Sequence, residues 1–287
     1  MIIDCHFHLD PEMMDISQII QRMDQSKIDK VALIASLIDP LPDPPKFLIP
    51  CLIWLLKRNM FRPLGRILCS NFTKQGDIQI LSKTYSIYQK PDNDPIFNAI
   101  DQYPERFLGW AFINPNSDQD IVLETNRWID HPNCIGIKTH PFWHQYRPVE
   151  LIPAAKIAAK KGKPILIHLG FDEHGDYLSL LEAIPELKLI IAHAGFPKYS
   201  DQWDIIRTLP NVFVDLSQTI YVDMQTIKEV VRCLGPEKCL FGTDGPYGSK
   251  NKDGLFDFDI ISQQISQLFP EPDAQECIMG NNFKQFL

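Results

Sequence analysis

The chain has 287 residues, of which 45% are apolar and 22% are charged, as in an ordinary globular protein. This composition excludes a disordered chain, a collagen and a coiled coil. Lysine and arginine number 28 against 36 acidic residues, so the net charge is −8, which repels a phosphate backbone. We therefore expect a small-molecule partner and no nucleic acid.

The cysteines and the N-terminus predict a cytoplasmic protein. Seven scattered cysteines form no CxxC pair, and Cys134 and Cys239 lie inside apolar runs, which is typical of reduced, buried thiols. The start of the chain lacks the basic and apolar regions of a signal peptide. The longest apolar stretch, at 47–56, contains Pro50 and is about half the length that a membrane span needs.

Short apolar runs recur along the chain with helix-length segments between them. Most are continuous rather than alternating, which indicates parallel strands that are covered on both faces. Their starts are 23–30 residues apart, with one exception, and eight strand–helix units in about 250 residues are typical of a (β/α)8 TIM barrel. A doubly wound open sheet is the alternative, but no GxGxxG follows the first run. The predicted strands are Ile2–Cys5, Val31–Ile34, Phe107–Phe112, Cys134–Lys138, Pro164–His168, Lys188–His193, Asn211–Asp215 and Lys238–Gly242.

The exception is the long interval between the second and third strands. We predict a helical insertion there, at about 42–95, between the breakers LPDPP and KPDNDP. It contains FLIPCLIWLLKRNMFRPLGRIL and a second predicted helix, ILSKTYSIY. A packed helical hairpin is the simplest interpretation, and a lid or dimer contact is the alternative because of its apolar residues. Membrane-surface binding through Lys57, Arg58, Arg62 and Arg66 is a third hypothesis. Residues 1–287 are otherwise expected to form one barrel domain that ends in two helical segments.

Polar side chains occur where predicted strands end, and the active sites of this fold lie at the C-terminal ends of its strands. A single histidine at such a position is more often structural, and HxH alone is a weak signal. Five ionisable groups at the same end of four strands instead favour a site for Zn²⁺ or a similar divalent ion. They are His6 and His8 on strand one, His168 on strand five, His193 on strand six and Asp244 after strand eight.

The other four histidines do not end strands. His131 is expected at the surface and His174 in a solvated loop. His140 and His144 follow strand four and lie within possible reach of a substrate, although a structural role is as good an interpretation.

Five motifs together resemble the amidohydrolase-related metal-dependent hydrolases, in the branch that includes aminocarboxymuconate-semialdehyde decarboxylase. They are HFH after strand one, GIKTHP after strand four, ILIHLG after strand five, IAHAG after strand six and FGTDGPYG after strand eight, and the terminal MGNNFKQFL resembles the closing helix. The resemblance covers the chain except the insertion. It implies a (β/α)8 fold, with His6, His8, His168 and Asp244 as metal ligands.

The resemblance leaves two residues open. His193 is either a ligand of a second metal or a catalytic group beside the first. In binuclear members, a lysine at the end of strand four is carboxylated and bridges two metals. Lys138 has this role or otherwise contacts the substrate or the metal ligands. We favour one ion per chain, with Zn²⁺ first, and keep two as the alternative.

The expected activity is hydrolysis of an amide, ester or lactone by metal-activated water. Asp244 is the predicted general base, and His193 is predicted to hydrogen-bond the developing oxyanion. Non-oxidative decarboxylation of a small aromatic or enoic acid is the alternative. The predicted substrate-binding residues are Lys138, His140, Trp143, Arg147 and Tyr247, with Arg147 as a carboxylate clamp.

Two other classes are less consistent with the sequence. A TatD-type nuclease expects an acidic residue at the end of strand four, where this chain has Lys138. A binding scaffold has no need of five ionisable residues at the strand ends. A homodimer is a further possibility that no residue demonstrates.

Overall fold

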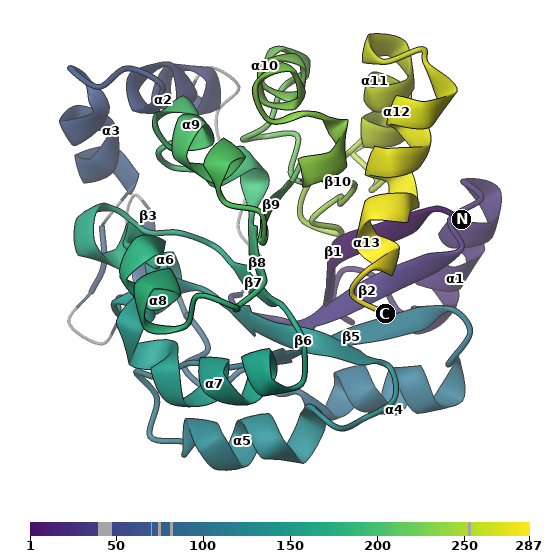
Figure 1. Cartoon of the computed structure of the whole chain (residues 1–287), viewed down its shortest axis with the longest axis horizontal. Coiled ribbons are helices and arrows are strands. Elements are labelled where there is room, and N and C mark those ends of the chain that lie inside the picture. Colours follow the sequence, from purple (N-terminus) through teal and green to yellow (C-terminus); the bar gives the residue numbers. More distant parts are fainter. Residues whose placement is uncertain (40–47, 70, 74–75, 81–82, 252–253) are drawn as a thin grey trace.

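The computed structural model describes residues 1–39, 48–69, 71–73, 76–80, 83–251 and 254–287. Among them, eight strands form one parallel sheet in the order β1-β2-β5-β6-β7-β8-β9-β10 (Figure 1). All eight predicted strands are confirmed. Their bounds are Ile3–Leu9 (β1), Lys30–Ala35 (β2), Phe107–Phe112 (β5), Cys134–Thr139 (β6), Ile165–Ile167 (β7), Leu189–Ile191 (β8), Val212–Asp215 (β9) and Cys239–Leu240 (β10).

Backbone hydrogen bonds between β1 and the segment that begins in β10 close the sheet into a barrel. The amide of Cys5 donates to Phe241 O at 3.0 Å, and the amide of Asp244 donates to His6 O at 2.8 Å. Phe7 also pairs in parallel with Gly245. The fold is therefore a (β/α)8 TIM barrel, as predicted, and Asp244 is held beside β1 by the closure itself.

Helices surround the barrel and bury the outer faces of its strands (Figure 1). Their side chains and the residues inside the barrel form one continuous apolar core. Aspartates begin several helices, and the carboxylate of Asp15 forms a capping box with Gln18 at the start of α1. The helices that surround the barrel are Ile16–Gln25 (α1), Asp94–Gln102 (α4), Ile121–Trp128 (α5), Ile152–Lys160 (α7), Tyr177–Ala183 (α8), Ser200–Thr208 (α9), Met224–Leu234 (α10) and Asp259–Leu268 (α11).

Shorter helical turns join these elements. After β6 comes the four-residue α6 (Pro141–His144), and the C-terminal segment adds α12 (Pro272–Glu276), a π-helix (Cys277–Asn281) and α13 (Asn282–Lys284). Single 3₁₀ turns lie at Pro148–Leu151, Asp172–Gly175, His193–Gly195 and Pro236–Lys238. The expected helical C-terminus is thus confirmed. No described helix has the length and apolar character needed to cross a bilayer.

The insertion after β2 contains helices α2 (Leu48–Leu56) and α3 (Arg62–Cys69), so a helical insertion is confirmed. The prediction of a second helix at ILSKTYSIY, residues 80–88, is wrong. Ile78–Ile80 (β3) and Lys83–Tyr85 (β4) instead pair as antiparallel strands. Isoleucine, threonine and tyrosine favour extended backbone, and Ile78 and Ile87 pack with Ile38 in a small separate core. The LPDPP breaker lies outside the described residues.

Candidate metal centre

The strand β1 runs to Leu9, which places both histidines of the HxH motif within it. Residues two apart on a strand share one face, so His6 and His8 point to the same side. Both side chains are buried, and their ring centroids are 5.5 Å apart. The sequence thus places two imidazoles side by side at the end of the barrel where Asp244 also lies.

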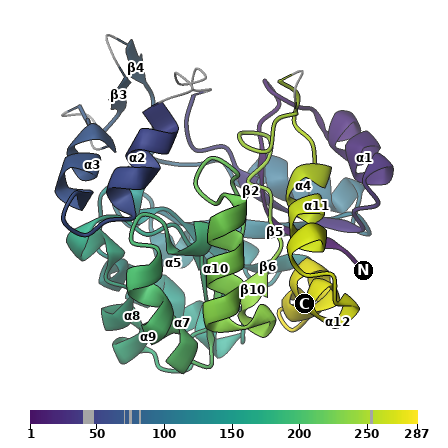
Figure 2. The same cartoon turned by 90° about the horizontal axis from the view of Figure 1, so that it is seen from above.

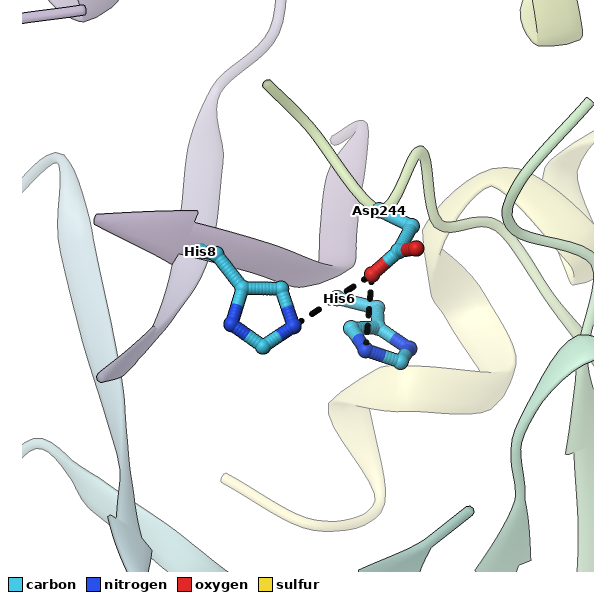
Figure 3. Close-up of side chains that lie close together, drawn as sticks. All are labelled: His6, His8 and Asp244. Carbon is cyan, nitrogen blue, oxygen red and sulfur yellow. Dashed lines mark ion pairs between the residues drawn. The ribbon is translucent and has the colours of Figure 1, made fainter. Parts of the chain in front are cut away.

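Three ligand atoms converge between β1 and the segment after β10 (Figure 3). The Oδ1 atom of Asp244 lies 3.2 Å from His6 Nε2 and 3.4 Å from His8 Nε2. All three atoms lie within 4.8 Å of one another, in a buried position that is able to hold a metal ion. Two imidazole nitrogens and a carboxylate oxygen are a donor set that suits Zn²⁺ and similar divalent ions.

The Nδ1 atom of each ring hydrogen-bonds to an acceptor, so each Nε2 carries a lone pair that is able to bind a metal. His6 Nδ1 donates to Asp215 Oδ2 at 2.9 Å, and His8 Nδ1 donates to Ala35 O at 3.0 Å. Asp244 Oδ2 accepts a 2.8 Å hydrogen bond from Gln218 Nε2. Metal-binding histidines typically have such a partner on the far nitrogen. The residues present therefore fit a divalent cation.

Burial and the nearby charge of Lys138 together lower the pKa of His6 to about 4, so this imidazole is neutral at neutral pH. Burial alone would raise the pKa of Asp244, but the neighbouring His6 and His193 outweigh it and hold that pKa below its usual range. Neutral imidazole and ionised carboxylate are the forms that bind a metal.

Two further histidines continue the arrangement along the barrel. The ring of His193 stacks 5.0 Å from His6, and the ring of His168 lies 4.8 Å from His193. Burial lowers the pKa of both imidazoles. His168 Nδ1 donates to Leu169 O at 3.0 Å, so its Nε2 is also free. His168 is not in the group of converging ligand atoms, and its role as a ligand stays a prediction.

Lys138 is fully buried next to the converging atoms. Its Nζ lies 3.2 Å from His6 Nε2, the nitrogen that faces Asp244. Burial lowers the pKa of Lys138 to about 8, against the opposing effect of Asp215 and Asp244. A buried ammonium thus lies within the candidate site.

The other predicted substrate residues divide between the site and the surface. His140 stacks on His168 at 4.0 Å, and Trp143 stacks on His140 at 5.6 Å. The Tyr247 ring lies 5.3 Å from His8. Arg147 is apart from them, because its side chain is 57% exposed and pairs with Glu150 at 3.7 Å.

The remaining histidines lie outside the donor group. His131 Nε2 lies 3.0 Å from Asp101 Oδ1 on the barrel exterior, and His174 is partly exposed near Glu173. His144 is buried and hydrogen-bonds Tyr88 O at 3.1 Å. We therefore do not include them among the ligands.

The sequence interpretation missed three buried polar residues, Asp215, Ser217 and Gln218. Asp215 ends β9, and its carboxylate oxygens lie 2.9 Å from His6 Nδ1 and 3.9 Å from His193 Nδ1. His6, His193 and Asp215 form a second group with the spacing of a metal site. The signal that was available is the position of Asp215 at the end of the seventh predicted strand, where the other site residues also lie.

The fold is a TIM barrel with a candidate metal site at the ends of its strands. The sequence model of the amidohydrolase family matches residues 83–286, and this chain therefore belongs to that family. Among curated protein sequences, none matches the chain.

Solved structures with the same fold include decarboxylases and a hydrolase. The 2,6-dihydroxybenzoate decarboxylase from Rhizobium is 14% identical with a TM-score of 0.61, over 99% of this chain and 98% of that one. A probable 2-pyrone-4,6-dicarboxylic acid hydrolase from Acinetobacter baumannii is 14% identical with a TM-score of 0.62, over the same shares of both chains. The 5-carboxyvanillate decarboxylase from Novosphingobium aromaticivorans, solved with bound manganese, is 14% identical with a TM-score of 0.57, over 93% and 79%.

Proposed function

We propose that this protein is a metal-dependent hydrolase that cleaves an amide, ester or lactone of a small molecule. The observation that supports this proposal is the convergence of His6 Nε2, His8 Nε2 and Asp244 Oδ1 at the buried end of the barrel. A divalent cation held there would lower the pKa of a water molecule from 15.7 toward about 7 and would polarise a carbonyl oxygen.

Asp244 is the residue to which we assign proton transfer. Its Oδ1 faces the two imidazoles, while Gln218 fixes Oδ2 at 2.8 Å and so holds the carboxylate plane. From this position Asp244 accepts a proton from the attacking water and returns it to the leaving group. His168 completes the proposed ligand set from the end of β7.

Lys138 supports a substrate that carries a negative charge. Its ammonium is buried beside His6, and the pKa of about 8 leaves it mostly protonated at pH 7. A buried cation is stabilised by a partner of opposite sign, and a substrate carboxylate supplies one. Since Arg147 lies at the surface, we transfer carboxylate binding from Arg147 to Lys138, with His140, Trp143 and Tyr247 as the surrounding contacts.

Decarboxylation is the second candidate. It is favoured by the same buried Lys138 and by two of the three compared structures, which are decarboxylases of carboxylated aromatic compounds. In this reaction Lys138 binds the substrate, and Asp244 or His193 protonates the carbon that loses CO₂. We propose one metal ion per chain, Zn²⁺ first, and include Mn²⁺ in the tests because one compared structure holds it.

The test measures metal content and then turnover. Inductively coupled plasma mass spectrometry should find about one metal ion per chain. Two ions per chain would indicate that His193 and Lys138 are also ligands. The loaded enzyme is then assayed on lactones, esters, amides, and aromatic and enoic acids, with acid release and CO₂ release followed in parallel. Acid without CO₂ supports hydrolysis, and CO₂ without water consumption supports decarboxylation.

The variant Asp244→Asn should lower kcat/KM by about 10²–10⁴-fold, because the proton acceptor is lost. The control is Asp130→Asn, which removes an exposed carboxylate that pairs with Lys161 on the outside of the barrel. Full activity of Asp244→Asn would refute the assigned role.

A further inference from the structure

Ser217 lies between Asp215 and His193 at the buried end of β9. Its Oγ atom is 2.5 Å from Asp215 Oδ1 and 2.9 Å from His193 Nδ1. None of the three side chains is more than 3% exposed. The three side chains therefore hydrogen-bond to one another and not to solvent.

The number of protons decides the direction of these hydrogen bonds. An ionised carboxylate accepts only, so the single hydroxyl proton of Ser217 points to Asp215. The Ser217 oxygen then accepts from His193, which requires a proton on Nδ1. The carbonyl oxygen of Ser217, 3.3 Å from the same nitrogen, is also an acceptor and requires the same proton.

Asp215 is itself anchored so that it cannot turn away. Its Oδ1 accepts from the backbone amides of His193 at 2.9 Å and Ser217 at 3.0 Å. Its Oδ2 accepts from His6 Nδ1 at 2.9 Å. One carboxylate therefore contacts the Nδ1 edge of His6 directly at 2.9 Å and that of His193 through the Ser217 hydroxyl, which also lies 3.3 Å from His6 Nδ1.

We propose that Ser217 and Asp215 are positioning residues that fix His193 as the Nδ1–H tautomer, with a lone pair on Nε2. This inference deepens the proposed function and rests on it only for the role of His193. In this tautomer the neutral ring accepts a proton or a metal at Nε2, and it donates a proton from Nε2 only after it has accepted one. The predicted role of His193 as an oxyanion donor is thereby replaced by that of a proton acceptor.

The test reads the tautomer directly and needs no substrate. Metal-free protein labelled with ¹⁵N-histidine is studied by long-range ¹H–¹⁵N spectra at neutral pH, with the variant His193→Gln for assignment. We expect Nδ1–H for His193 in the natural chain. In Ser217→Ala, we expect part of His193 to shift to the Nε2–H form, while His6 stays as Nδ1–H.

Two other variants separate this role from general damage to the fold. Ser217→Thr keeps the hydroxyl and should restore the His193 signal. Ser36→Ala removes a serine hydroxyl that contacts Tyr247 in the same site, and should leave the His193 tautomer unchanged. Asp215→Asn should disturb both histidines and weaken Zn²⁺ binding by about 10–100-fold, as measured by competition with a chelator.

Two results would overturn the proposal: Nε2–H for His193 in the natural chain, or a Ser217→Ala spectrum identical to it. A protein that shows the tautomer shift but turns over no substrate would refute the proposed function and leave the positioning pair standing.

Discussion

His144 is a buried histidine that neighbours the site without belonging to the donor group. Its Nε2 donates to Tyr88 O, and among the described residues its buried Nδ1 has no hydrogen-bond partner. Burial lowers its pKa to about 4, below the ordinary value of 6.5. Protonation of this ring is therefore coupled to unfolding.

The metal-free protein should lose stability as the pH falls from 6.5 toward 4, and His144 should account for part of the loss. Between these values the unfolded chain binds the proton more strongly than the folded chain, so the free energy of unfolding falls as the pH falls. Between pH 7.5 and 5.0 the share of one such histidine is about 2 kcal/mol. Urea unfolding should be measured at pH 7.5 and at pH 5.0. Between these pH values, the free energy of unfolding of His144→Met should fall by about 2 kcal/mol less than that of the natural chain.

His131→Gln is the control for this measurement, because His131 lies on the exterior beside Asp101. An equal pH dependence in His144→Met and in the natural chain would contradict the expected contribution.

At the scale of elements, the cations of the insertion face the barrel. In helix α3, Arg62 pairs with Asp201 and Arg66 pairs with Asp172. Lys57, at the end of α2, pairs with Asp223 at 3.4 Å. Figure 2 shows α2, α3 and the β3–β4 hairpin together on one side of the molecule.

These pairs bear on the three hypotheses for the insertion. The membrane hypothesis needs four exposed cations, but three of them pair with carboxylates of the barrel. This favours the packed hairpin. The outward side of α3 is apolar, with Leu64, Ile67 and Leu68 more than half exposed. A lid or dimer contact stays a prediction, as does the homodimer.

Removal of the ion pairs should loosen the insertion without unfolding the barrel. Each pair at the surface contributes roughly 0–1 kcal/mol, so the double variant Asp172→Asn/Asp201→Asn should change the global stability little. Hydrogen exchange by mass spectrometry should become faster in α2 and α3, while the amides of β5 and β6 stay protected.

Asp130→Asn removes the ion pair between Asp130 and Lys161, the residue that follows α7, and is the matched control; it should leave the exchange of α2 and α3 unchanged. If the double variant exposed the barrel strands as well, the insertion would be part of the cooperative core.

At the scale of the whole molecule, one apolar core extends around the barrel and includes residues of β1, β10 and the C-terminal helices. We propose on this basis that residues 1–287 act as one domain, with the insertion attached to it. A core of this extent should keep the chain folded without metal, so that metal binding adds to an existing stability.

A bound divalent cation should therefore raise the melting temperature. A ligand at 100 times its Kd stabilises the folded state by about 2.7 kcal/mol. Zn²⁺ should raise the Tm of chelator-treated protein, as followed by differential scanning fluorimetry, and His8→Gln should lose most of the rise. His131→Gln should keep it. A rise of equal size in His8→Gln would contradict the proposed donor set.

The sequence by itself determined the eight strands, their order of appearance and the ionisable residues at their ends. These properties depend on apolar runs and spacing, which are local, and on the rule that the ends of parallel strands meet at one face. The helix expected at 80–88 was wrong, because β-favouring residues and the contacts of Ile78 and Ile87 with Ile38 select a strand pair there.

Only the tertiary structure decided which atoms meet. The Nδ1 partners of His6 and His8 are a side chain 209 residues away and a backbone oxygen of the neighbouring strand. Ser217 and Gln218 gain their roles because barrel closure brings the segment from β10 beside β1, with β9 as the next strand. Hydrogen bonds of this kind depend on distances between segments remote in sequence, and no local pattern contains those distances.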